Sequence, residues 1–148
     1  MKRTIRMAAA IAVGSSMALT GCGQQTVSPN LPAFATIDDA YDAVDRVLDC
    51  EPDPAGLPIV PMGDGVELTS DQILCAEHLQ IDLYPDGDSL QQSHDIWATS
   101  HQGAVHLVRG GNWMVVDVSE AAVGEPSARD FEALAEELGG QHLVVGSN

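Results

Sequence analysis

The sequence predicts an α+β fold in which three helices pack on one face of a mainly antiparallel sheet, with one disulfide. Segments with helical periodicity alternate with apolar or alternating segments, in the order helix, strand, helix, hairpin, helix, strand. The glycine pair Gly110-Gly111 interrupts a long apolar stretch, which predicts a hairpin turn. Two cysteines, Cys50 and Cys75, are placed to close a loop. This order is typical of helices packed against an antiparallel sheet.

The first helix is expected over residues 37–49. Thr36 and Asp39 have the spacing of a capping box. Apolar residues then recur at helical spacing: Ile37, Ala40, Tyr41, Val44, Val47 and Leu48. Another stripe carries four aspartates, Asp38, Asp42, Asp45 and Asp49. Like charges at this spacing are typical of a solvated helix face, and a weak divalent-cation surface is the alternative.

An irregular loop is expected over residues 51–65, because four prolines and three glycines fall there. Residues 69–72 are expected to cap a short helical turn before the second cysteine of the domain. A half-buried strand is expected over residues 76–84. Its apolar positions alternate with polar ones: Leu79, Ile81 and Leu83. A second helix is expected over residues 89–101, capped by Asp88.

Residues 104–118 are expected to form a hairpin that lies in the middle of the sheet, because both faces of its strands are largely apolar. Either Gly110-Gly111 or Gly111-Asn112 can supply the positive φ that a tight turn needs. A two-residue Gly110-Gly111 turn would pair Leu107 with Met114 on one face and Val108 with Trp113 on the other. After a break at residues 124–126, a capping box at residues 127–130 starts a third helix with an apolar stripe. Gly139 ends this helix. The last strand is expected over residues 143–145.

The chain has 22 acidic residues but only 6 lysines and arginines, so its net charge is −16. Nucleic acid is therefore excluded as a partner, because the domain has too few cations to neutralise phosphates. The high charge is typical of a solubilised surface. Recruitment of a cation or of a basic partner is the alternative.

The N-terminus has the features of an export signal. Lys2, Arg3 and Arg6 precede an apolar run over residues 7–19, which is shorter than the roughly 20 residues of a membrane span. The run ends in Leu19-Thr20-Gly21-Cys22, which resembles the lipobox of bacterial lipoproteins. An ordinary signal peptide, which needs no cysteine at the cleavage site, is the alternative.

The lipobox resemblance implies lipid on the Cys22 thiol and cleavage before this residue. It implies three parts: a signal peptide over residues 1–21, the lipidated cysteine and a flexible tether over 22–35, and one acidic domain over 36–148. The protein is then expected on the extracytoplasmic face of the cell membrane, anchored through Cys22. The mature chain would carry three arginines and all 22 acids, a net charge of −19.

With Cys22 lipidated, Cys50 and Cys75 remain, and in an oxidising compartment they are expected to form a disulfide. A redox site is the alternative, although redox cysteines usually lie two residues apart. The domain is also similar to small secreted lipoproteins of actinobacterial type, which have no assigned activity. The shared features are these two cysteines, Gly111-Asn112-Trp113, and Leu138-Gly139-Gly140 after the last helix.

The sequence contains no nucleophile elbow, phosphate loop or zinc-protease motif. A non-enzymatic binding or interaction module is therefore expected, with no cofactor and an unidentified envelope protein or cationic partner as its ligand. Arg109, Trp113 and His106 are its candidate ligand surface, although the sequence favours Arg109 paired with carboxylates and Trp113 packed in the core. Two other functions stay open. His94, His101 and His106 could bind a metal, and Ser93, His106 and Asp117 could form a hydrolase site.

Overall fold

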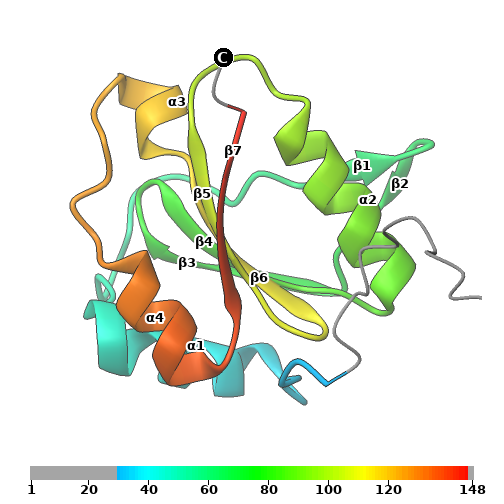
Figure 1. The fold of residues 1–148 in the computed structure, drawn as a ribbon, viewed down its shortest axis with the longest axis horizontal. Coiled ribbons are helices and arrows are strands. Elements are labelled where there is room, and N and C mark those ends of the chain that lie inside the picture. The colour runs from blue at the N-terminus through cyan, green and yellow to red at the C-terminus, as the bar shows by residue number, and fades with distance from the viewer. Residues whose placement is uncertain (1–29, 147–148) are drawn as a thin grey trace, which may run out of the picture.

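The computed structural model describes residues 30–146. The elements, labelled in Figure 1, are α1 Ile37–Leu48, β1 Met62–Gly63, β2 Val66–Glu67, β3 Asp71–Ala76, β4 Leu79–Leu83, α2 Gly87–Ala98, β5 Val105–Arg109, β6 Trp113–Asp117, α3 Ser119–Val123, α4 Phe131–Leu138 and β7 Gln141–Val145. The last strand therefore starts two residues earlier than expected.

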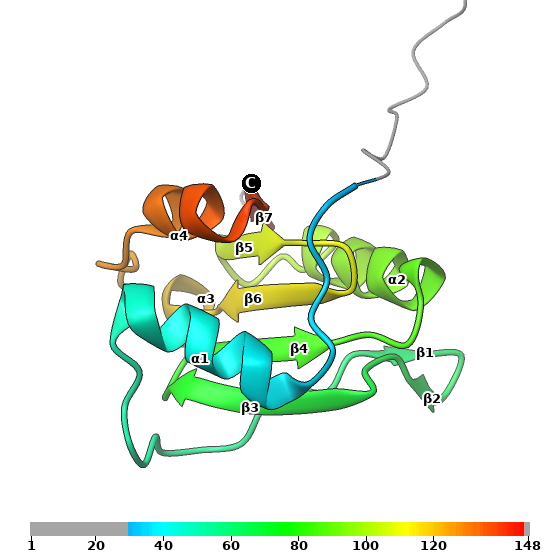
Figure 2. The ribbon, with the colours of Figure 1, turned by 90° about the horizontal axis from the view of Figure 1, so that it is seen from below.

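The main sheet has five strands in the order β3-β4-β6-β5-β7, and every neighbouring pair is antiparallel. Figure 2 shows this order from bottom to top, with α1 in front of β3 and β4. β1 and β2 form a separate two-stranded hairpin. The α+β class and the mainly antiparallel sheet are confirmed. The disulfide is confirmed as well, because Cys50 and Cys75 are joined in the structure.

Helices cover both faces of the sheet, so the expectation of three helices on one face is wrong. Side chains of α1 and α4 belong to one buried cluster, together with Ile81, Val108 and Trp113. Leu90 and Trp97 of α2 belong to a second cluster. Figure 1 shows α1 and α4 on one side of the sheet and α2 on the other. The physical reason is the apolar character of both faces of β5 and β6, each of which must be covered. A fourth helix, α3, was not expected.

The first helix forms as the sequence predicts. The Thr36 hydroxyl accepts a hydrogen bond from the Asp39 N–H at 3.1 Å. At the other end Asp49 has a left-handed backbone with φ of 54°. The Asp45 carboxylate accepts a hydrogen bond from the Cys50 N–H at 2.8 Å. Asp45, a member of the aspartate stripe, therefore stabilises the backbone after α1, where the chain reaches Cys50.

The expected helical turn over residues 69–72 is wrong, because this stretch leads directly into the edge strand β3. Asp71 pairs with Leu83, and Ile73 with Ile81, so β3 and β4 form a hairpin. The capping pattern at 69–72 is local, whereas pairing with β4 satisfies the backbone groups on the side of β3 that faces β4. The strand expected over 76–84 is the second half of this hairpin.

Two helices start at other caps than expected. Asp86, not Asp88, caps α2, and its carboxylate accepts a hydrogen bond from the Ser89 N–H at 2.7 Å. Asp130 caps α4 by accepting a hydrogen bond from the Ala133 N–H at 2.9 Å. In both cases the acid directly precedes the first helical residue, which is where the free N–H groups can reach it.

The β5–β6 hairpin has the expected faces but a register shifted by two residues. Leu107 lies opposite Val116, and the Gly110 N–H donates to the Trp113 carbonyl at 2.9 Å, so Gly111 and Asn112 form the turn. A shift of two keeps every side chain on its face. The expected positive φ is absent at both turn glycines. Gly111 is required by close packing instead, because a Cβ there would lie 2.6 Å from the Leu31 carbonyl oxygen.

Residues 31–35, expected to belong to a flexible tether, pack against this turn. The Phe34 N–H donates to Asn112 Oδ1 at 2.9 Å, and Asn112 Nδ2 donates to the Phe34 carbonyl at 2.8 Å. The Trp113 indole N–H donates to the Pro32 carbonyl at 2.8 Å. Residues that pack as part of the domain therefore begin before residue 36, near residue 31. Residues 22–29 lie outside the described residues.

Candidate functional site

A cluster of buried and half-buried polar side chains lies on the α2 face of the sheet. It consists of Gln72, Gln80, Asp82, Tyr84 and Ser93, which we call the clamp cluster. The Asp82 carboxylate is completely buried. It accepts hydrogen bonds from the side-chain amides of Gln72 and Gln80, both at 2.9 Å, and from the Tyr84 hydroxyl at 3.2 Å. The Tyr84 and Ser93 hydroxyls are 2.8 Å apart, which ties β4 to α2.

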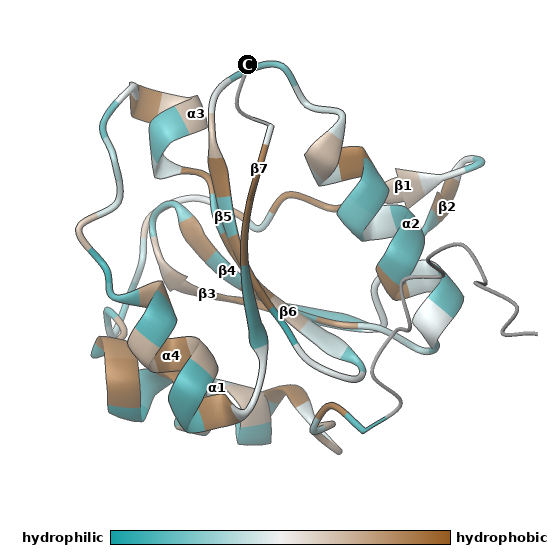
Figure 3. Ribbon diagram, viewed as in Figure 1, coloured by the Kyte–Doolittle hydropathy of each residue, from teal (hydrophilic) through white to brown (hydrophobic). Residues whose placement is uncertain are grey.

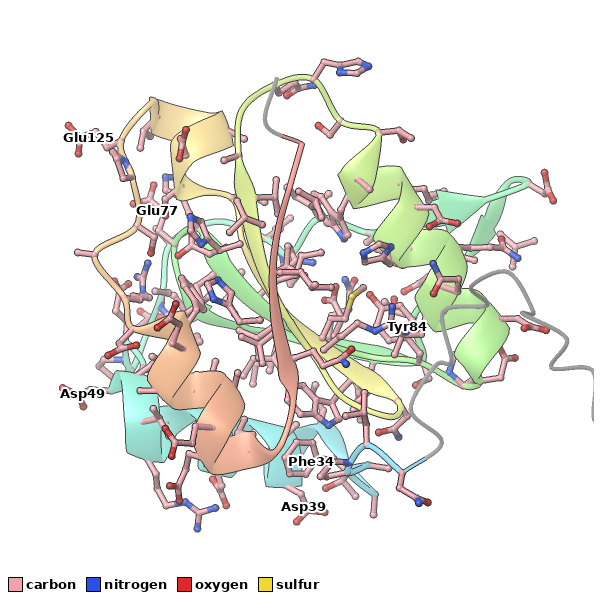
Figure 4. The ribbon with its side chains drawn as sticks, in the orientation of Figure 1. Phe34, Asp39, Asp49, Glu77, Tyr84 and Glu125 are labelled. Carbon is pink, nitrogen blue, oxygen red and sulfur yellow. A yellow bond between two sulfur atoms is a disulfide. The ribbon has the colours of Figure 1, made fainter. Side chains whose placement is uncertain are left out.

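Burial sets the electrostatics of the clamp cluster. It raises the pKa of Asp82 to about 6, against three side-chain hydrogen bonds that favour the charged form. Burial also raises the pKa of Tyr84, and the nearby Asp82 charge adds to this effect. Tyr84, labelled in Figure 4, thus stays protonated and able to donate a hydrogen bond. Because these groups are shielded from solvent, their arrangement suits a structural role.

The clamp cluster holds a chain segment against the sheet. The Ile59 N–H donates to Gln80 Oε1 at 2.8 Å, and Gln80 Nε2 donates back to the Ile59 carbonyl at 2.9 Å. Gln72 Nε2 donates to the same carbonyl at 3.0 Å. Ile59, which lies outside any strand, therefore has both backbone polar groups hydrogen-bonded to side chains of the clamp cluster. The clamp cluster thus holds the backbone at residue 59 against the sheet.

The segment fastened in this way exposes apolar side chains, and we call residues 57–66 the apolar segment. Leu57 is 87% exposed and Val66 is 65% exposed. Among the described residues, eight large apolar side chains are exposed, and five of them lie here: Leu57, Ile59, Val60, Met62 and Val66. Figure 3 colours β2 and the chain leading into β1 as hydrophobic. Exposed apolar side chains gathered in one place are typical of an interaction site.

A depression of about 340 Å³ lies beside the apolar segment, at the free edge of the sheet. It is lined by Tyr41 of α1, by residues of β3, and by the loop that follows the disulfide. The lining residues are Tyr41, Glu51, Pro52, Pro54, Pro58, Gln72, Ile73 and Leu74. Gln72 is shared with the clamp cluster, so the two features are one continuous structure.

The loop carrying these residues is held at both ends. The Cys50–Cys75 disulfide joins its start to β3, and the Glu51 N–H donates to the Cys75 carbonyl at 2.7 Å. At its far end the Leu68 N–H donates to the Pro61 carbonyl at 3.0 Å. The surface is therefore formed before any partner arrives, which lowers the entropic cost of binding.

The structure separates the candidate ligand surface Arg109, Trp113 and His106. Trp113 is completely buried and packs with Phe34, at 5.4 Å between ring centroids. Arg109 points to the opposite face, where Nη1 donates to Gln91 Oε1 at 3.2 Å. Burial lowers the pKa of Arg109, and the charge of Asp95 opposes this effect. The interpretation that places Trp113 in the core is correct, whereas the expected pairing of Arg109 with a carboxylate is not found among the described residues, where Arg109 donates to an amide.

His106 lies on β5 in a stack with two other rings. Its ring centroid is 5.4 Å from that of Phe131 and 5.6 Å from that of His142. The His106 Nδ1 and His142 Nε2 atoms are 3.3 Å apart, a hydrogen bond. Burial, followed by the charge of His106, lowers the pKa of His142. His94 instead contacts Asp95 at 3.2 Å, on α2.

The other sites considered from the sequence do not form in the described residues. No group of three or more histidines, cysteines or acids between residues 30 and 146 is arranged to hold a metal ion. In the candidate hydrolase site, the Ser93 hydroxyl is hydrogen-bonded to the Tyr84 hydroxyl. Asp117 pairs with Arg129 at 3.0 Å and accepts a hydrogen bond from the Ser127 hydroxyl at 2.8 Å. The lipidation site Cys22 lies outside the described residues.

None of the helices between residues 30 and 146 has the length and apolar character that a membrane crossing requires. Comparisons of the chain with protein-family models, with curated proteins and with solved structures found no match.

Proposed function

We propose that this chain is a lipid-anchored protein of the cell envelope and that its domain is a non-enzymatic binding module. The observation that carries the binding role is the apolar segment, which exposes five large apolar side chains and whose backbone is held at Ile59 by the clamp cluster. Each Å² of apolar surface that a partner covers contributes about 25 cal/mol. A preformed apolar surface therefore favours association more than a mobile one does.

The proposed anchor is the lipobox cysteine, Cys22, after removal of residues 1–21. The acidic mature chain would be repelled by anionic lipid headgroups. Two or more acyl chains on the N-terminal cysteine would overcome this repulsion, whereas one would hold the protein weakly. In this proposal the anchor determines where the domain resides and the apolar segment determines what it binds.

Site-specific photocrosslinking in intact cells tests the binding role. A photoreactive amino acid replaces Leu57, Met62 or, as a matched control, Val123, which is 56% exposed but lies on α3. We expect one discrete adduct that is shared by the first two positions and absent from the third. Identical adduct patterns at all three positions, or none at positions 57 and 62, would contradict a binding surface at this segment.

Cys22→Ala tests the anchor. We expect loss of lipid labelling and loss of retention in the membrane fraction, because the acyl chains are attached to this thiol. Membrane fractions washed with salt and carbonate are compared by immunoblot with those of the unsubstituted protein. Retention of the processed protein after the substitution would refute lipid anchoring.

A further inference from the structure

The acidic residues around the apolar segment lie in a long stretch of sequence without lysine or arginine. Between Arg46 and Arg109 the chain contains no lysine or arginine. Six exposed acids lie from the end of α1 to the start of β3: Asp49, Glu51, Asp53, Asp64, Glu67 and Asp71. None of these six carboxylates forms an ion pair within residues 30–146. The apolar side chains are thus exposed within a negatively charged surface.

Two of the residues that line the depression have side chains of the types that recognise a cation on an apolar stem. Tyr41 is aromatic and Glu51 is acidic. Three prolines, Pro52, Pro54 and Pro58, add apolar walls. Lysine and arginine side chains have methylene stems that pack on apolar surface while their charged ends stay solvated. The depression therefore has the chemistry to accept one such side chain.

We propose that the apolar segment and the depression together bind a cationic polypeptide segment that also carries apolar side chains. This inference rests on the proposed function and adds the chemical class of the partner. A basic side chain enters the depression between Tyr41 and Glu51, and neighbouring apolar side chains cover Leu57 and Met62. Charge complementarity favours this occupant over a bilayer, because anionic headgroups would be repelled by the six acids.

The test measures binding of two dye-labelled nine-residue peptides by fluorescence anisotropy. One alternates lysine with leucine or valine, and in the other glutamate replaces each lysine. The full lipidated protein in neutral detergent is titrated into each peptide. We expect binding of the lysine peptide only, and weakening as salt rises. Equal binding of both peptides, or no binding of the lysine peptide at about 1 mM protein, overturns the inference.

Two double variants separate local from overall charge. Glu51→Gln/Asp53→Asn and Glu136→Gln/Glu137→Gln each remove two exposed negative charges, but the second pair lies on α4, which covers β5 and β7. We expect the first to lower affinity for the lysine peptide about fivefold and the second less than about twofold. Equal losses in the two variants would mean that the peptide responds to net charge, which overturns the inference.

The other possible occupants are separate outcomes. Flotation with phosphatidylcholine vesicles that depends on Leu57 would assign the surface to lipid, and a dimer abolished by Leu57→Ser would assign it to a second copy. Either result overturns the inference. If the photocrosslinks at positions 57 and 62 form but the peptides fail, only the partner class is wrong. If those crosslinks are absent, the proposed function itself fails.

Discussion

Asp82 provides a quantitative test of the clamp cluster, because its carboxylate is completely buried next to neutral partners. Its pKa rises from the usual 3.8 to about 6. At about 1.4 kcal/mol per pKa unit, this difference corresponds to about 3 kcal/mol of unfolding free energy. The group has a higher pKa in the folded state, so its stabilising contribution is complete below pH 3.8 and is lost as the pH rises through 6.

The measurement is urea unfolding of the purified protein and of Asp82→Asn between pH 4.5 and pH 7.5. About 2 kcal/mol of the Asp82 contribution falls in this window. Asparagine does not titrate, so the unfolding free energy of the variant should fall less with rising pH. We therefore expect the difference between the two proteins to change by about 2 kcal/mol in favour of the variant.

The control is Glu77→Gln, which removes one exposed negative charge at the β3–β4 turn, labelled in Figure 4. It should shift the unfolding free energy by less than about 0.5 kcal/mol at every pH. Parallel pH curves for Asp82→Asn and the unsubstituted protein would refute the reasoning, since they would mean that Asp82 has the same pKa when folded and unfolded. The test compares how the unfolding free energy changes with pH, so a constant loss of stability in Asp82→Asn does not affect it.

Three further predictions concern the fold. Asn112→Ala should lower the unfolding free energy by about 2 kcal/mol, since it removes two hydrogen bonds to Phe34; urea unfolding measures this. Arg129→Met should lower it by about 3 kcal/mol in the same assay, because the buried Asp117 carboxylate loses its ion pair, and an effect below about 1 kcal/mol would contradict this. Alkylation of the denatured, non-reduced protein followed by mass analysis should leave Cys50 and Cys75 unmodified, because they are joined in a disulfide. Alkylation of both residues would contradict this disulfide.

Local signals in the sequence were sufficient for several elements of the fold. The cap at Thr36 and the apolar periodicity after it identify α1 within one residue. The alternation along residues 105–117 assigns the faces of β5 and β6 correctly, because a strand places successive side chains on opposite faces. These features depend only on residues close in sequence, so pattern reasoning finds them.

The sequence-based predictions are wrong where the local structure depends on contacts with residues far away in the sequence. The sequence allows a turn at Gly110-Gly111 or at Gly111-Asn112, and local pattern alone does not choose between them; in the structure Gly111 and Asn112 form the turn, and residue 31, distant in sequence, lies against Gly111. The stretch before Cys75 forms β3 because β4 pairs with it, although its own sequence has a capping pattern. Phe34 was assigned to the tether, but its hydrogen bonds are to Asn112, 78 residues away.

The candidate site was missed for a related reason. Gln80 and Asp82 alternate with apolar residues on β4, a pattern that indicates a solvent-exposed polar face. In the structure α2 and the apolar segment cover that face, so both polar side chains are buried. The exposed apolar run was visible in the sequence, within the loop expected over residues 51–65. Prolines and glycines marked it as irregular, but irregular backbone can still be rigid when side chains bind it.

The chemistry of Asp82 explains why a carboxylate is buried beneath a surface that could have been built on apolar residues. A charged carboxylate only accepts hydrogen bonds. It therefore faces the NH₂ group of Gln80 at both of its oxygens, at 2.9 and 3.0 Å. With that end fixed, Gln80 Oε1 is the atom left for the Ile59 N–H. Burial of the charge destabilises the fold above pH 6, and in return the amide of Gln80 is oriented so that it binds both backbone polar groups of Ile59.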